Sequence, residues 1–172
     1  MKTIYIAGPD VFEQDSVEIG KRYVDLCSDY GFKGVYPLDN KVNFNQAKQN
    51  IAKEFFEANI RLIHQADIVI ANLNSFRGKE ADSGTVWECG YAYALNKKVY
   101  GYMNSRTHYL EQFGNTEKKL LSGKYVDMDN RDIEDFDYPI NLMIACSVEN
   151  IITGGFEEVL RLLVNSNTNS IN

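Results

Sequence analysis

Hydrophobic and polar residues alternate along the chain in blocks that predict strands and helices in turn. The run 67–73 is apolar almost throughout, which is typical of a central parallel strand covered on both faces. Shorter apolar runs predict further strands, and apolar residues at helical spacing predict the helices between them. The predicted strands cover 4–7, 33–36, 67–73, 99–103 and 150–153. The predicted helices cover 16–30, 45–64, 82–96 and 155–164.

Strands that alternate with helices indicate right-handed crossovers and an open parallel sheet. We therefore expect an α/β protein with a single flavodoxin-like domain, about five parallel strands, and helices on both faces. This domain is expected over 1–164, followed by a frayed tail at 165–172 that is rich in Asn and Ser. The polar segment 107–135 is predicted to be irregular, with a helix near Leu110 and Lys119, and 139–147 a helical turn.

Composition narrows the function classes. The chain has 172 residues and a net charge of −6, which argues against a protein that coats a nucleic acid polymer. A small nucleoside ligand stays possible. No apolar run is long enough for a membrane span or a signal peptide. The three cysteines are scattered along the chain and odd in number, which favours a cytoplasmic location. The two histidines lie far apart in sequence, so we expect no metal site, and no motif predicts another cofactor.

The loop after the first strand, Gly8-Pro9-Asp10, is a candidate binding segment, because ligands of such sheets bind beyond the carboxyl ends of the strands. The loop contains neither the dinucleotide fingerprint nor a P-loop. Gly8 lets the backbone approach a ligand closely, whereas Asp10 would repel a phosphate. The alternative is a plain turn that ends the strand.

A second candidate is the stretch Asp82-Ser83-Gly84-Thr85-Val86-Trp87-Glu88. Helical spacing places Gly84 and Glu88 on one face, so that Gly84 leaves space in front of the carboxylate. Asp82, at the start of the helix, would point to the same cleft, and two carboxylates beside a gap suit glycosyl chemistry. The helix N-terminus is expected to keep Glu88 ionised. The alternative is that Asp82 only caps the helix and that Glu88 lies on the surface. We favour a catalytic role, because the helix continues apolar nearly all round and should be buried, and a buried carboxylate needs a reason.

Two further residues, Tyr5 and Asn59, allow two interpretations each. Tyr5 is either a core aromatic or a hydroxyl that holds a carboxylate in place. Asn59 lies on the apolar stripe of its helix. It is either a core amide whose hydrogen bonds are satisfied or an amide that contacts a base. Taken alone, Asn141 is a helix cap and Met143 a core residue.

Three segments together resemble the nucleoside 2-deoxyribosyltransferases: 5–12, 75–92 and 139–143. The loop 36–40 resembles the family's second-strand loop as well. The resemblance implies a flavodoxin-like fold and the transfer of 2-deoxyribose from a 2′-deoxynucleoside to a free nucleobase. A covalent deoxyribosyl-enzyme links the two half-reactions, and no cofactor takes part.

The resemblance also implies roles for individual residues. Glu88 aligns with the nucleophile that attacks C1′, and Tyr5 with the tyrosine that positions it. Asp82 aligns with an aspartate that contacts the sugar's hydroxyls and assists proton transfer. Asn141 and Met143 align with residues supplied by a neighbouring subunit, which implies a homo-oligomer, either a dimer or a hexamer.

One departure concerns the base. Some family members carry an aspartate where this sequence has Asn59, and an amide that both donates and accepts favours purines and pyrimidines alike. Gly8, Pro9, Asp10 and Gly84 complete the predicted substrate site.

One alternative function is a 2′-deoxynucleoside 5′-monophosphate N-glycosidase, which would need a phosphate-binding group near the first loop. The other is a non-catalytic nucleotide-sensing module on the same fold, which would not need a buried carboxylate pair.

Overall fold

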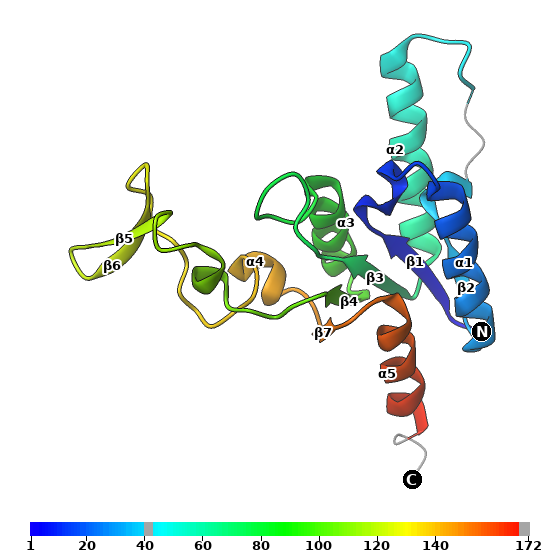
Figure 1. Ribbon diagram of the computed structural model, residues 1–172. Helices are drawn as coiled ribbons and strands as arrows, with labels where there is room; N and C mark the ends of the chain where they lie inside the picture. Colours follow the sequence, from blue (N-terminus) through cyan, green and yellow to red (C-terminus); the bar gives the residue numbers. More distant parts are fainter. Residues whose placement is uncertain (40–42, 169–172) are drawn as a thin grey trace.

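Five strands form one parallel sheet in the computed structural model, which describes residues 1–39 and 43–168 (Figure 1). They are β1 (Thr3–Ala7), β2 (Lys33–Val35), β3 (Ile68–Asn72), β4 (Lys98–Met103) and β7 (Asn150–Thr153). Their order is β2-β1-β3-β4-β7, with every neighbouring pair parallel. The predicted flavodoxin-like α/β fold is therefore confirmed.

Helices cover both faces of the sheet. They are α1 (Ser16–Asp29), α2 (Lys48–Gln65), α3 (Ser83–Ala94), α4 (Leu142–Ala145) and α5 (Phe156–Thr168). Ile4 and Ile6 of β1 pack with α1 and α5, whereas Tyr5 and Ala7 face α2 and α3. Both faces are thus apolar, which explains why the strands contain few polar residues. None of the described helices is long and apolar enough to cross a bilayer.

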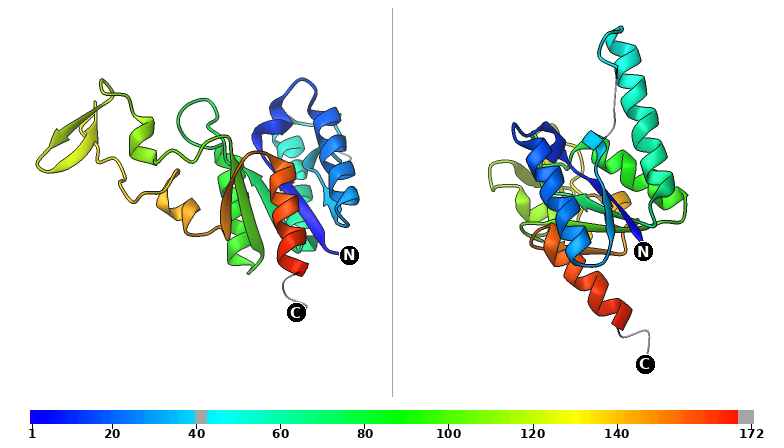
Figure 2. Two further views of the ribbon diagram at one scale, coloured as in Figure 1. Left: turned by 60° about the horizontal axis from the view of Figure 1, so that its bottom comes forward. Right: turned by 90° about the vertical axis from the view of Figure 1, so that its right-hand side faces the viewer.

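The segment after β4 differs from its prediction. The described part of the chain contains three short 3₁₀ helices: η1 (Pro9–Phe12), η2 (Pro37–Asp39) and η3 (Tyr109–Gln112). The helix predicted near Leu110 is only η3, and Lys119 lies in an antiparallel hairpin of β5 (Lys118–Leu121) and β6 (Lys124–Asp127). Ser122 and Gly123 both have positive φ, as a two-residue hairpin turn requires. This hairpin stands away from the main sheet in Figure 1 and in the left view of Figure 2.

The closing helix is longer than predicted. α5 continues to Thr168, so 165–168 are helical rather than part of the predicted tail. Residues 169–172 lie outside the described residues, as does Asn40 of the predicted second-strand loop. The Ser166 hydroxyl donates to the carbonyl of Leu162 one turn earlier. Such a bond to the carbonyl four residues earlier is a known arrangement for a serine inside a helix.

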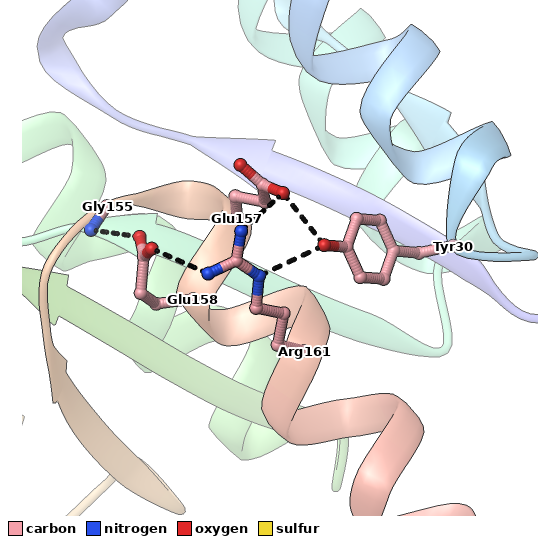
Figure 3. A network of polar contacts seen from close by, with 5 residues as sticks. All are labelled: Tyr30, Gly155, Glu157, Glu158 and Arg161. Atoms are coloured by element: carbon pink, nitrogen blue, oxygen red, sulfur yellow. Dashed lines mark hydrogen bonds and ion pairs between the residues drawn. The ribbon is translucent and has the colours of Figure 1, made fainter.

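A polar network joins α1 to α5 on one face of the sheet (Figure 3). The Tyr30 hydroxyl donates to Glu157 at 2.8 Å and accepts from Arg161 Nε at 3.2 Å, and Arg161 also pairs with Glu157 at 2.9 Å. Glu158 accepts from the backbone N–H of Gly155, which satisfies a donor at the start of α5. The network holds the closing helix in register on the opposite face from α2 and α3.

Gly20 provides a test of packing on this same face. A Cβ at position 20 would lie 2.3 Å from the Tyr36 ring, which is buried. We expect Gly20→Ala to lower the free energy of unfolding by about 1–3 kcal/mol, because the ring has to move in a packed core. The control is Gly90→Ala, also in a helix, where a Cβ meets nothing within 4 Å. Urea unfolding of both variants checks the prediction, and equal stabilities would contradict it.

Candidate active site

A tyrosine and a glutamate far apart in sequence meet beside the sheet. Tyr5, on β1, is fully buried, and its hydroxyl donates to Glu88 Oε1 on α3 at 2.6 Å. The two residues are 83 positions apart, and they meet because α3 packs over β1 and β3. The short distance is typical of a hydrogen bond from a hydroxyl to an ionised carboxylate.

Glu88 also lines a pocket of about 350 Å³ between α2 and α3. Of the residues predicted for the substrate site, Asn59 and Gly84 line the same pocket. Four apolar residues that the sequence analysis did not select complete the lining: Phe56, Ile60, Ile63 and Trp87. Three of these four lie on one face of α2 next to Asn59, a spacing that was visible in the sequence.

The environment of Glu88 overturns the expectation that it stays fully ionised. Burial raises the pKa of Glu88 to about 7; the hydrogen bond from Tyr5 opposes this shift, and the negative charge of Asp82 adds to it. Glu88 lies in the second turn of α3, beyond the first turn where the helix dipole acts. Loss of solvation therefore dominates, and both protonation states are populated near neutral pH.

Asp82 caps α3. Its Oδ2 atom accepts from both the backbone N–H and the hydroxyl of Thr85, each at 2.9 Å. A Cβ on Gly84 would approach this oxygen to 3.1 Å, so the glycine accommodates the cap as well as lining the pocket. Asp82 does not itself line the pocket; it acts on Glu88 through its charge.

The first loop lies at the carboxyl end of β1, outside the pocket lining. Gly8 and Pro9 are buried, and Asp10 accepts from Asn72 Nδ2 at 3.0 Å and from the Tyr23 hydroxyl at 3.3 Å. A Cβ on Gly8 would lie 2.5 Å from Asp10 Oδ2. Only glycine therefore allows the Asp10 carboxylate to fold back over the end of the strand.

Asn141 and Met143 are not at this pocket. Asn141 caps α4 by accepting from the backbone N–H of Met143, and it donates to Glu134 at 2.6 Å. Met143 is 72% exposed, so the interpretation of Met143 as a core residue is wrong. Within one chain, neither side chain lines the pocket at Glu88; Met143 lines a separate hollow with Val86 and Gly90 of α3.

The burial of α3 also differs from the prediction. Two aromatic residues of the helix, Trp87 and Tyr93, are 48% and 58% exposed. The helix covers the sheet with its Cys89 and Ala92 side only. Glu88 is therefore a partly buried residue at the edge of an exposed aromatic surface.

The strand order β2-β1-β3-β4-β7, with helices on both faces, places the protein in the flavodoxin-like class of α/β proteins. The sequence profile of one family, described as Nucleoside 2-deoxyribosyltransferase, matches residues 4–143. The chain therefore belongs to the nucleoside 2-deoxyribosyltransferase family, which confirms the resemblance seen in the sequence.

Three individual proteins are similar to this chain. The structure of a 2-deoxyribosyltransferase from Leishmania mexicana is 31% identical, with a TM-score of 0.73, and the match covers 96% of this chain and 98% of that one. A 2-deoxyribosyltransferase from Bacillus psychrosaccharolyticus shares the fold at 20% identity, with a TM-score of 0.58 over 92% and 90% of the two chains. An uncharacterised protein of Schizosaccharomyces pombe is 25% identical over 89% of this chain and 75% of its own length.

Proposed function

We propose that this protein transfers 2-deoxyribose from a 2′-deoxynucleoside to a free purine or pyrimidine base, with Glu88 as the nucleophile. The observation that carries the proposal is the Tyr5 hydroxyl on Glu88 Oε1, at a pocket that Asn59 and Gly84 also line. A carboxylate held by a hydroxyl and open to a pocket is equipped for attack on a sugar carbon. Family membership supports the same substrate class.

The reaction runs in two displacements. A carboxylate oxygen of Glu88 bonds to C1′ while the C1′–N bond breaks, and the base nitrogen keeps that electron pair and takes up a proton. The acceptor base then bonds to C1′ through its own nitrogen, loses its proton, and releases the Glu88 carboxylate. Two inversions at C1′ retain the configuration, as in retaining glycosidases.

The neighbouring groups have supporting roles in this proposal. Tyr5 directs one oxygen of Glu88 and leaves the other for attack. Asp82 contacts the sugar's hydroxyls and assists proton transfer, and its charge contributes to the raised pKa of Glu88. Gly8, Pro9 and Asp10 form the substrate loop at the end of β1. We assign the reaction to the salvage of nucleobases.

The first loop favours a nucleoside over a nucleotide substrate. A 5′-monophosphate would need cationic or hydroxyl groups, whereas Gly8-Pro9-Asp10 presents a carboxylate there. This disfavours the N-glycosidase alternative. A sensing module would not need a carboxylate with a raised pKa at a pocket, a feature that clusters at catalytic sites.

Product analysis tests the proposal. The protein is incubated with 2′-deoxyinosine and adenine, and separately with 2′-deoxyinosine alone, and the products are separated by chromatography. We expect 2′-deoxyadenosine to form much faster than free 2-deoxyribose. Free sugar without base exchange, or no reaction until a 5′-phosphate is present, would instead identify a glycosidase.

We further propose that Asn141 and Met143 reach the pocket of a second copy of the chain, since they lie outside their own chain's pocket. Asn141→Ala is then expected to lower activity by about tenfold or more. Co-expression of Asn141→Ala with Glu88→Gln should restore activity to about a quarter of the wild-type level in a dimer, because one site of each mixed pair is intact. The control is each variant expressed alone. Two folded variants that never complement each other would contradict a shared site.

A further inference from the structure

The carboxylate of Glu134 holds the start of α4 with both of its oxygens. Oε1 accepts from Asn141 Nδ2 at 2.6 Å, and Oε2 accepts from the backbone N–H of Leu142 at 2.8 Å. Both bonds are partly buried, and such short distances are typical of bonds that a carboxylate accepts. Glu134 therefore fixes the Asn141 side chain relative to the backbone that carries it.

These contacts decide how the Asn141 amide is turned. A carboxylate can only accept, so the amide atom that faces Glu134 has to be the nitrogen. The amide oxygen, Oδ1, accepts from the backbone N–H of Met143 at 2.9 Å. Each end of the amide is thus held once by the described residues. One N–H of Nδ2 and one acceptor position of Oδ1 are left in fixed places for a ligand.

Glu134 reaches α4 from the hairpin of β5 and β6, which stands away from the main sheet (Figure 1). The two residues before it are attached to β6. The N–H of Ile133 donates to the carbonyl of Tyr125 at 2.9 Å, and Asp132 forms an antiparallel bridge with Val126. Ile133 is also buried. The hairpin therefore gives the Glu134 carboxylate a defined position beside α4.

The capping of α4 does not account for the bond between Asn141 and Glu134. Asn141 caps the helix with Oδ1, and Leu142 is satisfied by the other oxygen of Glu134. The bond from Nδ2 to Oε1 satisfies no backbone group, so its effect is on the orientation of the side chain. A side chain whose orientation is locked by a supporting hydrogen bond is typical of functional sites. Asn141 lies outside its own chain's pocket, so this orientation matters where another molecule meets it.

We propose that Glu134 is a positioning residue: it holds the Asn141 amide in the orientation in which that amide meets the nucleoside bound in the pocket of a second copy of the chain. This assignment rests on the proposed function, which places Asn141 at such a shared site. A side chain that is already held loses less conformational freedom on binding than a free one, and this raises affinity. Without Glu134 the amide can turn about its last bond, and the advantage is lost.

Nucleoside affinity tests this role without requiring turnover. We titrate 2′-deoxyinosine into the Glu88→Gln protein by calorimetry, alone and with Asn141→Ala, Glu134→Ala or both. Asn141→Ala should weaken binding by about tenfold or more, and Glu134→Ala by about threefold to tenfold. The two changes together should weaken it no more than Asn141→Ala does, because Glu134 acts only through Asn141. Additional weakening in the combined variant would overturn the proposal.

A second variant separates orientation from folding. Glu134→Gln keeps the size of the side chain, but its own N–H group faces one of the two donors, so it should lose affinity as Glu134→Ala does. The matched control is Asp132→Ala in the same Glu88→Gln protein, which removes a carboxylate that pairs with Lys124 at 2.7 Å in an exposed ion pair. We expect this control to leave the affinity unchanged. Equal affinities for Glu134→Gln and Asp132→Ala would overturn the proposal.

Nuclear magnetic resonance of the Asn141 side chain reports the contact directly. The protein is labelled with ¹⁵N on asparagine, and the Asn141 side-chain signal is identified by its loss in Asn141→Ala. Its two Nδ2 protons should resonate far apart in the wild type, because only one of them is bonded to a carboxylate. They should move closer together in Glu134→Ala. A signal that is the same in both proteins would overturn the proposal.

These results are distinguishable from a failure of the proposed function. If the affinities and the Asn141 signal respond to Glu134 as expected, the positioning role stands even where no base exchange is found by chromatography. If base exchange occurs but Glu134→Ala binds 2′-deoxyinosine as tightly as Asp132→Ala does, the reaction stands and the positioning role does not.

Discussion

Replacement of Glu88 by Gln is expected to lower base exchange by at least about a thousandfold, because an amide cannot form the covalent bond to C1′. The amide oxygen can still accept the hydrogen bond from Tyr5, so the variant should fold and bind nucleoside. Chromatographic turnover and calorimetric binding measure the two properties separately. Retained turnover in Glu88→Gln would contradict the assignment of the nucleophile.

Glu88→Gln should also change how the free energy of unfolding depends on pH. The pKa of Glu88 is raised from 4.5 in its ordinary state to about 7 in the folded protein. Between these pH values the folded state binds more protons than the unfolded state, so this group makes stability fall as pH rises. Glu88→Gln removes the ionisation, and it should be more stable than the wild type by up to about 3 kcal/mol above pH 7. Denaturant unfolding of both proteins below pH 4.5 and above pH 7 checks the direction of this stability difference. A variant that is less stable than the wild type at high pH would contradict the prediction.

Replacement of Tyr5 by Phe is expected to reduce turnover at neutral pH by about tenfold or more. The hydrogen bond from Tyr5 holds the pKa of Glu88 down against burial. Without it the pKa rises further, a smaller share of Glu88 is ionised, and the rising limb of the pH profile of kcat moves to higher pH. The ring keeps its packing, so stability should change little. The measurement is kcat across this pH range.

Tyr36→Phe is the matched control for this substitution. Tyr36 is as buried as Tyr5, but its hydroxyl has no hydrogen-bond partner among the described residues. We expect its pH profile to match that of the wild type. If Tyr5→Phe also leaves the profile unchanged, Tyr5 is a core aromatic without a positioning role.

Much of the fold was predictable because its signals are local. The apolar run that became β3 and the helical spacing around it depend on neighbouring residues only. The cap of α3 at Asp82 was predictable for the same reason. The hairpin after β4 was missed, because its evidence is a two-residue turn, Ser122-Gly123, inside a polar segment.

The candidate site was predictable only in part. Gly84 and Glu88 are one turn apart on a single helix, so the sequence determines that they share a face. The protonation of Glu88 was not predictable, because burial depends on how α3 packs and outweighs the helix dipole. The contact between the Phe56 and Trp87 rings was not predictable either, since the two residues come from different helices and meet only after packing.

The sequence by itself determined the alternation of strands and helices, the parallel sheet and the helix that carries Glu88, since periodicity and capping act over a few residues. Only the tertiary structure decided that the Tyr5 hydroxyl lies on Glu88, that Asn59 faces the same pocket, and that Met143 is exposed. These relations join residues far apart in the chain. They are set by the packing of helices on the sheet, which local spacing does not encode.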